Sequence, residues 1–203
     1  MKLELSNIGK HFAYRWVFKN ISLQLETGQS LAITGPNGIG KSTLLKIIAS
    51  YMEPSEGKVE YSFNGKPVEQ ENIYNHIGMA APYMELINEY SLSELIQFYS
   101  CHKKVNDKLI NEAVLAFKLD SSLDKSLKYF SSGMLQRTKL LLALGSDSKI
   151  LLLDEPHTNL DSEGIETYGK LLDSRKNDSV VIISSNRKDE ISFCDSKMEL
   201  NPL

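Results

Sequence analysis

The sequence predicts an α/β fold with a mixed, mainly parallel sheet that carries helices on both faces. Three continuous apolar runs, at residues 30–34, 149–155 and 179–185, have the pattern of strands that are buried on both sides. Patterns with helical spacing follow two of these runs, at residues 43–50 and at about 161–174. Because parallel strands are joined through crossover helices, this alternation predicts a sheet of that kind.

A glycine-rich loop lies between the first of these strands and the helix after it. It matches the pattern G-x-x-x-x-G-K-[ST] and consists of Gly35, Pro36, Asn37, Gly38, Ile39, Gly40, Lys41, Ser42 and Thr43. The glycines let backbone N–H groups line an anion site, and the positive end of the following helix points at the same site. Lys41 can then reach the β- and γ-phosphates of a nucleotide, and the Ser42 hydroxyl can hold Mg²⁺. The strand before the loop and the helix after it argue against a chance glycine-rich turn and predict a P-loop NTPase core.

The N-terminal part of the chain predicts an antiparallel β subdomain. Residues 2–8, 21–25 and 58–63 alternate apolar and polar side chains, and Asn64-Gly65 is a strong signal for a hairpin turn. An aromatic cluster at residues 11–16 lies between the first two strands. One of its rings could stack on a nucleotide base, but from the residues alone packing between the strands is the favoured interpretation. Shorter strands are predicted at residues 77–80 and 198–200.

The segment from about residue 82 to residue 145 predicts an inserted helical subdomain. Ser91-Leu92-Ser93-Glu94 is a capping box in front of an apolar helix, and Asn106 can cap the next helix. A third helical stretch covers residues 131–144 and ends at Gly145. Within a single domain of residues 1–203, the expected division is a core of residues 1–81 and 146–203 and a helical subdomain of about 82–145.

Two acids, Asp154 and Glu155, end the second buried strand. An acid at this place, downstream of a phosphate-binding loop, suits the Walker B role, in which Asp154 holds Mg²⁺ through water. Glu155 would then face the γ-phosphate and orient or deprotonate the attacking water. The alternative is an exposed acidic pair that opens a turn before Pro156, and the apolar run ahead of the acids argues against it.

The helical stretch at residues 131–144 starts with small residues and offers a second anion site. Free N–H groups and the hydroxyls of Ser131 and Ser132 gather at its N-terminus. Taken alone, this is a serine N-cap of the kind that many helices have. Its place shortly before Asp154 and Glu155 favours a role in phosphate binding.

Bulk composition excludes several classes of function. The 203 residues carry a net charge of −3, so no global basic field predicts a nucleic-acid partner. The two cysteines, Cys101 and Cys194, are far apart, which argues against a disulfide scaffold or a zinc site. The first residues lack the apolar core of a signal peptide, and no apolar run approaches the roughly 20 residues of a membrane helix. We therefore expect a cytoplasmic chain whose membrane role comes through a partner.

Taken together, the motifs resemble the nucleotide-binding ATPase subunit of an ABC transporter over nearly the whole chain. In chain order they are the P-loop at 35–43, the signature at 130–134, Walker B at 150–155 and the D-loop at 158–161. The resemblance implies ATP and Mg²⁺ as cofactors and a head-to-tail homodimer with ATP between one P-loop and the partner's signature. It also implies that Ser131 and Gly133, within the signature that includes Ser132 and Met134, contact the γ-phosphate across the interface. By the same resemblance, Asp161 helps to join the two sites. Phe12 would stack on adenine, with Tyr14 and Trp16 as alternatives.

The chain departs from the family's pattern at three places. Ser132 and Met134 replace a glycine and a glutamine of the family's signature, and Pro82 replaces the family's Q-loop glutamine. Asn186 replaces the family's switch histidine. It can donate a hydrogen bond to the γ-phosphate but cannot carry a proton. These departures bear on the turnover rate more than on nucleotide binding, and because Glu155 is present we expect hydrolysis.

The function that the resemblance implies is an ATPase subunit that drives transport through a separate transmembrane permease. ATP closes the homodimer, hydrolysis opens it, and the permease docks around residues 83–94, which places the chain on the inner face of the cell membrane. Within the family the chain looks most like small single-domain subunits of the haem-exporter or multidrug type. The alternatives are a soluble ABC-type ATPase without a transporter and a nucleotide-dependent switch with weak hydrolysis.

Overall fold

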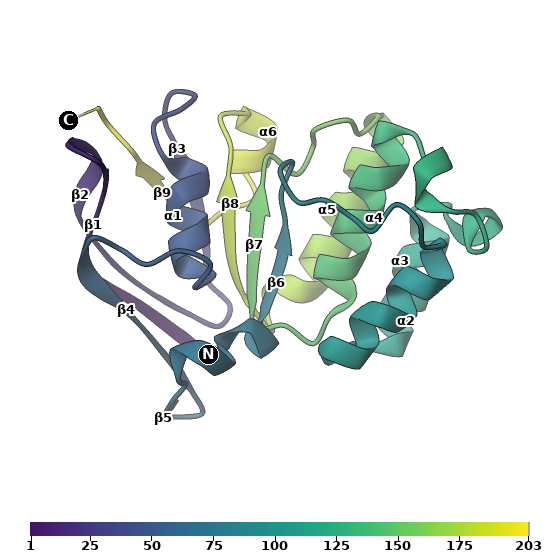
Figure 1. The fold of residues 1–203 in the computed structure, drawn as a ribbon, viewed down its shortest axis with the longest axis horizontal. Coiled ribbons are helices and arrows are strands. Elements are labelled where there is room, and N and C mark those ends of the chain that lie inside the picture. Colours follow the sequence, from purple (N-terminus) through teal and green to yellow (C-terminus); the bar gives the residue numbers. More distant parts are fainter. Residues whose placement is uncertain (203) are drawn as a thin grey trace.

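The computed structural model describes residues 1–202 and contains two β-sheets with helix α1 (Lys41–Ile48) between them (Figure 1). The parallel sheet holds, in spatial order, β6 (Ile77–Ala80), β7 (Ile150–Asp154), β8 (Val180–Ser184), β3 (Ser30–Thr34) and β9 (Ser196–Glu199). The antiparallel sheet holds β2 (Arg15–Glu26), β1 (Lys2–Phe12), β4 (Glu56–Phe63) and β5 (Lys66–Pro67). The other α-helices are α2 (Leu92–His102), α3 (Asp107–Ala116), α4 (Ser132–Gly145), α5 (Ser162–Lys176) and α6 (Lys188–Ile191), with 3₁₀ turns at Gln70–His76, Asp120–Ser122 and Leu127–Tyr129.

The parallel sheet is buried on both faces, as its apolar runs predict. Successive side chains of β7 point to opposite sides, so Ile150 and Leu152 pack toward α1 while Leu151 and Leu153 pack toward α4 and α5. The α/β prediction is therefore confirmed, with one correction. Within residues 1–202 every pairing in this sheet is parallel, and the antiparallel pairs lie in the other sheet rather than in a mixed one.

The antiparallel sheet forms a second layer over α1, and the first hairpin is longer than the alternation predicts. β1 and β2 continue to a turn at Ala13, which has a φ of 51°, and His11 pairs with Trp16 across it. The side chains at this tip are mostly exposed, so they carry no apolar alternation that could indicate a strand. The predicted hairpin at Asn64-Gly65 is present between β4 and β5.

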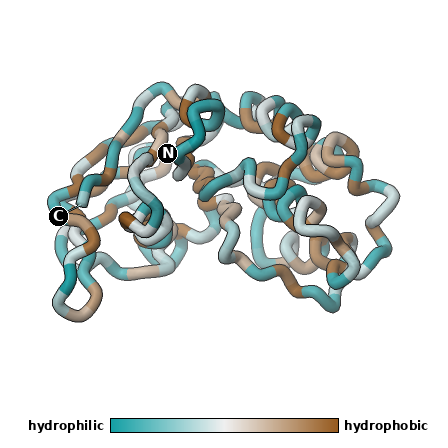
Figure 2. The backbone as a smooth tube through the Cα atoms, turned by 90° about the horizontal axis from the view of Figure 1, so that it is seen from above, coloured by the Kyte–Doolittle hydropathy of each residue, from teal (hydrophilic) through white to brown (hydrophobic). Residues whose placement is uncertain are grey.

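The helical segment contains the predicted caps. Ser91 and Glu94 form a reciprocal capping box at the start of α2, and the Asn106 side chain accepts hydrogen bonds at the start of α3. α4 packs on α3 and also on β6, so one apolar cluster continues from the helical segment to the sheet. Figure 2 shows brown apolar stretches in both the strand-rich and the helical part of the chain. The division at about residues 82 and 145 stays a prediction.

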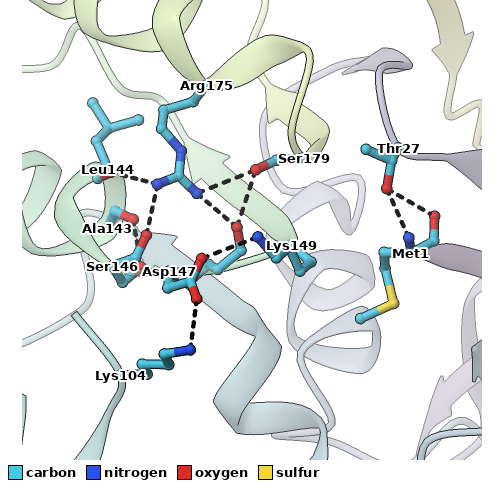
Figure 3. Close-up of polar contacts among 11 residues, drawn as sticks. Met1, Thr27, Lys104, Ala143, Leu144, Ser146, Asp147, Lys149, Arg175 and Ser179 are labelled. Atoms are coloured by element: carbon cyan, nitrogen blue, oxygen red, sulfur yellow. Dashed lines mark hydrogen bonds and ion pairs between the residues drawn. The ribbon is translucent and has the colours of Figure 1, made fainter. Parts of the chain in front are cut away.

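A buried arginine, Arg175, holds the end of the sheet opposite the phosphate loop (Figure 3). Its guanidinium donates to the carbonyl oxygens of Ser146 at 2.8 Å and Ser148 at 2.6 Å, and to the Ser179 hydroxyl at 3.2 Å. These bonds join α5 to the connection before β7 and to the start of β8. Because a buried charge is tolerated only with such partners, Arg175 is a structural anchor.

Among residues 1–202, no helix combines the length and the apolar character that a bilayer crossing needs.

Candidate nucleotide-binding site

A cavity of about 580 Å³ lies at the carboxyl ends of the parallel strands. It is formed by the loop after β3, the first turn of α1 and the segments after β7 and β8. Ligands of open α/β sheets bind at this edge. The residues that line it are Asn37, Gly38, Gly40, Lys41, Ser42, Thr43, Asp154, Glu155, Thr158 and Asn186.

The glycine-rich loop leaves its N–H groups available at the start of α1. Gly40 is the N-cap at a φ of 112°, no side chain caps the helix, and no acid lies in its first turn. A Cβ at Gly40 would lie 2.4 Å from Cγ1 of Val17, so glycine is required both for the conformation and for the space. The uncapped amides and the helix dipole together make a site for a phosphate group.

Lys41, the first residue of α1, is buried at the floor of this loop. Its ammonium donates to the carbonyl oxygen of Gly35 at 2.7 Å and to that of Pro36 at 3.4 Å. Neutral carbonyls are weaker partners for an ammonium than phosphate oxygens are. The amine is therefore already inside the loop and can exchange these contacts for a phosphate.

Asp154 and Ser42 supply the oxygen atoms that suit Mg²⁺. The Asp154 side chain ends β7 and is 2% exposed, and it lines the cavity together with the Ser42 hydroxyl. Magnesium prefers carboxylate and hydroxyl oxygens and keeps several waters. The donor set of the cavity fits this ion.

Glu155 follows in a left-handed conformation, with a φ of 46°, which turns the chain away from the strand direction. Its N–H donates to the Ser184 carbonyl oxygen of β8 at 2.9 Å. Burial raises the pKa of its carboxyl group, while the nearby charge of Lys41 acts in the opposite direction. A carboxylate of raised pKa beside a phosphate site is suited to accept a proton from water.

Asn186, after β8, is in contact with the glycine-rich loop. Its side-chain oxygen accepts the Gly35 N–H at 3.1 Å, and its amide donates to the Asn37 side-chain oxygen at 3.4 Å. Asn186 also lines the cavity. The residue at the expected switch position is thus joined to the loop that would hold the phosphates.

Phe12 lines a second cavity, of about 350 Å³, on the other side of Gly38. Trp16 lines the same cavity, whereas Tyr14 lies at the exposed tip of the hairpin and does not line it. Phe12 is half exposed. Of the three aromatic residues considered, Phe12 and Trp16 are placed where a base joined to the phosphates could lie. The full lining is Phe12, Arg15, Trp16, Val17, Gly38, Ile39 and Pro202.

The signature residues Ser131–Met134 and Asp161 of the D-loop lie outside both cavities, whereas Thr158 of the D-loop lines the first one. Ser131 is the N-cap of α4 and accepts the Met134 N–H at 3.2 Å, and both Ser131 and Ser132 are exposed. Asp161 caps α5 through the Gly164 N–H at 2.8 Å and pairs with Arg137 of α4 at 2.7 Å. Within one chain these residues do not complete the phosphate site.

Comparison with known proteins decides the family. The model of the ABC transporter family matches residues 18–158, which include the glycine-rich loop, the signature and Asp154-Glu155. The chain belongs to the ABC transporter family.

Individual relatives agree with this assignment. The chain is 29% identical over 203 residues to the ABC transporter ATP-binding protein YybJ of Bacillus subtilis, covering 98% of this chain and 92% of YybJ. It is 34% identical over 201 residues to the arabinose import ATP-binding protein AraG of Pectobacterium atrosepticum, covering 93% of this chain but 39% of AraG. The ABC cassette MJ0796, solved as a dimer with ADP and Pi bound, superimposes with a TM-score of 0.85 over 98% of this chain and 94% of that one; at 23% identity this likeness shows the fold.

Pro82, the expected Q-loop position, does not line the cavity. Its carbonyl oxygen accepts a hydrogen bond from Lys139 of α4 at 3.1 Å. The next residue, Tyr83, lies under the ammonium of Lys46 at 4.0 Å, and burial raises the pKa of its hydroxyl, with the Asp154 charge acting in the same direction. The segment is therefore attached to α1 and α4 by contacts that involve no glutamine.

Sequence reasoning missed three residues next to the ABC site. Thr158 lines the cavity, and its signal was its place in the D-loop motif. Gln136 is buried on α4 and donates to the Pro156 carbonyl oxygen at 2.9 Å, although nothing in its sequence context indicates this contact. His157 is buried two residues after Glu155, and its signal was a histidine close in sequence to the pair Asp154-Glu155.

Proposed function

We propose that this chain hydrolyses ATP and thereby drives transport through a separate transmembrane permease. The observation that carries the proposal is the meeting of Lys41, Ser42, Asp154 and Glu155 around one cavity. Phosphoryl transfer to water needs an amine, a metal-binding pair and a carboxylate around one site, and this cavity brings these groups together. Membership of the ABC transporter family supports the transport role.

In the proposed reaction the chain mainly positions groups and stabilises charge. The amides of the glycine-rich loop and Lys41 bind the β- and γ-phosphates, and Ser42 and Asp154 hold Mg²⁺. When bound, the ion neutralises charge on the phosphate oxygens. Glu155 orients water and takes its proton, and Asn186 donates its amide hydrogen to the γ-phosphate.

A second copy of the chain would complete the site. The N-terminus of α4 begins with Ser131, Ser132, Gly133 and Met134, of which the two serines are exposed, and it offers donors that have no phosphate to bind within their own chain. We place these donors on the γ-phosphate of the partner's ATP, with Asp161 at the interface between the two sites. The dimeric state described for MJ0796 supports this arrangement.

The permease would dock beside α2, around residues 83–94. Tyr83 and Ile87 in this segment and Phe98 of α2 are exposed large apolar side chains, at 40%, 36% and 40% exposure. Exposed apolar groups of this kind are common at protein interfaces. Docking there would hold the chain at the inner face of the membrane and let the helical segment of about 82–145 transmit dimer closure.

The substitution Glu155→Gln tests the proposal. It keeps the shape of the side chain and removes the proton acceptor, so phosphate release should fall at least about a hundredfold while ATP still binds. The variant should also accumulate as an ATP-bound dimer in size-exclusion chromatography. Undiminished phosphate release by this variant would remove Glu155 from the reaction.

Asn186 favours one second candidate, a nucleotide-dependent switch with weak hydrolysis. Its amide can bind a γ-phosphate but cannot exchange a proton with it. Such a switch would bind ATP and dimerise, yet the wild-type chain would release phosphate no faster than Glu155→Gln. The phosphate-release assay of the two chains side by side therefore separates the candidates, and a permease that co-purifies separates both from a soluble ATPase.

A further inference from the structure

His157 is a buried histidine that none of the proposed steps uses. It lies two residues after Glu155, and its side chain is 0% exposed. Its backbone N–H donates to a carboxylate oxygen of Glu190 at 2.8 Å. On its ring, Nδ1 lies 3.2 Å from Asp189 Oδ2 and 3.3 Å from Glu190 Oε1.

Both carboxylates belong to α6, the short helix that follows Asn186. Asp189 is itself held by Arg187, whose Nε and Nη2 donate to its two oxygens at 3.2 and 2.9 Å. These hydrogen bonds lower the pKa of Asp189 to about 2, so this carboxylate is ionised and can only accept. Nδ1 of His157 must then carry the proton and donate it, which gives the contact a direction.

The rest of the imidazole ring is enclosed. It makes a T-shaped contact with the ring of Tyr168 of α5, with ring centroids 5.3 Å apart and planes at 84°. Nε2 is buried without a hydrogen-bond partner among residues 1–202. The ring therefore has two separable features, a donor on Nδ1 and an apolar body against Tyr168.

The two segments that His157 joins both contribute residues to the lining of the cavity. On one side Glu155 and Thr158 flank it in sequence and line the cavity; on the other, Asn186 precedes α6 and lines it too. The neighbouring Pro156 is fixed to the signature helix α4 through Gln136. A shift of either segment would change the distance between the Glu155 carboxylate and the amide of Asn186.

We propose that His157 is a positioning residue for ATP hydrolysis: by donating from Nδ1 to Asp189, beside its backbone bond to Glu190, it holds the segment after β7 against the segment after β8 and so sets the spacing of Glu155 and Asn186 around the γ-phosphate. This role rests on the proposed ATPase function. It differs from that function in that His157 touches neither nucleotide nor water.

Two substitutions separate the donor from the packing. His157→Asn places its amide nitrogen where Nδ1 lies but leaves a void against Tyr168, whereas His157→Phe fills the space and has no donor. We expect kcat of the Phe variant to fall on the order of tenfold and that of the Asn variant to stay within about threefold of wild type, with KM for ATP within about twofold in both. The melting temperatures should rank the two variants in the opposite order, because the void against Tyr168 makes the Asn variant less stable than the Phe variant.

The opposite ranking of rates would overturn the proposal, because a side chain that only packs tolerates Phe better than Asn. Equal rates in wild type and the Phe variant would overturn it as well. Hydrogen exchange of the Thr158 and Leu160 amides in nucleotide-free protein gives a readout that does not depend on hydrolysis: exchange should be faster in the Phe variant and close to wild type in the Asn variant. A wild-type chain that releases no phosphate would refute the proposed function, and the exchange data would still decide whether His157 joins the two segments.

Discussion

Two helices of this chain begin at motifs that we propose to bind phosphate, and their N-termini differ in structure. α1 begins at Gly40, in a left-handed conformation and with no side-chain cap, in a loop enclosed by the hairpin and the end of β8. α4 begins at Ser131, whose hydroxyl already accepts the Met134 N–H, and its first residues are exposed. At the α1 end, Lys41, Asp154 and Glu155 of the same chain line one cavity with the first amides of the helix. The α4 end lies outside that cavity.

This difference indicates that the two helix ends bind phosphate under different conditions. A helix N-terminus that lies in a built cavity can bind phosphate alone, since enclosed dipoles and a nearby amine act in a low-dielectric surrounding. An exposed N-terminus with its own serine cap binds an anion weakly, because water competes for the same amides. The α4 end should therefore contribute to binding only when a second chain covers it.

The largest expected effect comes from the α1 end. Lys41→Ala removes the charged donor from the loop, and ATP affinity should fall on the order of a hundredfold because charge-assisted contacts to phosphate are lost. Isothermal titration calorimetry with ATP and Mg²⁺ measures the change. Lys46→Ala is the matched control, because this lysine lies on the same helix outside the cavity. Equal affinities for the two variants would show that the α1 end does not bind phosphate through Lys41.

A smaller effect is expected at the α4 end. Ser131→Ala should lower the free energy of unfolding by about 1 kcal/mol, as the loss of an N-cap does. It should leave the ATP affinity of the monomer unchanged and weaken ATP-dependent dimerisation, measured by sedimentation in the Glu155→Gln background. Ser91→Ala, which removes the N-cap of α2, is the control for lost stability alone. If both variants dimerise like the parent, the α4 end takes no part in the dimer.

The smallest effect concerns the contact that holds α4 to α5. Asp161 accepts from the Gly164 N–H and from Arg137, and these two contacts lower the pKa of its carboxyl group below the usual 3.8. The stabilisation is therefore complete above pH 3.8 and disappears as pH falls further. Asp161→Asn keeps an acceptor for Gly164 and loses the charge. Urea midpoints of wild type and variant should differ slightly at pH 7 and converge near pH 2; a difference that persists at low pH would assign it to another cause.

Local patterns predicted the elements that depend on contiguous residues. The strands of the parallel sheet follow from apolar runs, and the caps at Ser91 and Asn106 follow from single side chains that bond within one helical turn. The hairpin tip at residues 11–16 was missed because solvent on both sides leaves no alternation to detect. The contacts of Arg175 were missed because most of its partners are backbone carbonyls, which every residue has.

By itself, the sequence determined the glycine-rich loop and the pair Asp154-Glu155, because both depend on backbone conformation and chain order over a few residues. The tertiary structure decided which distant groups meet them. Asn186 reaches Gly35, and His157 reaches Glu190, because the parallel register of β3, β8 and β7 brings the carboxyl ends of these strands to one edge. Segments 33 to 151 positions apart are joined there, and no local pattern encodes a distance across a sheet.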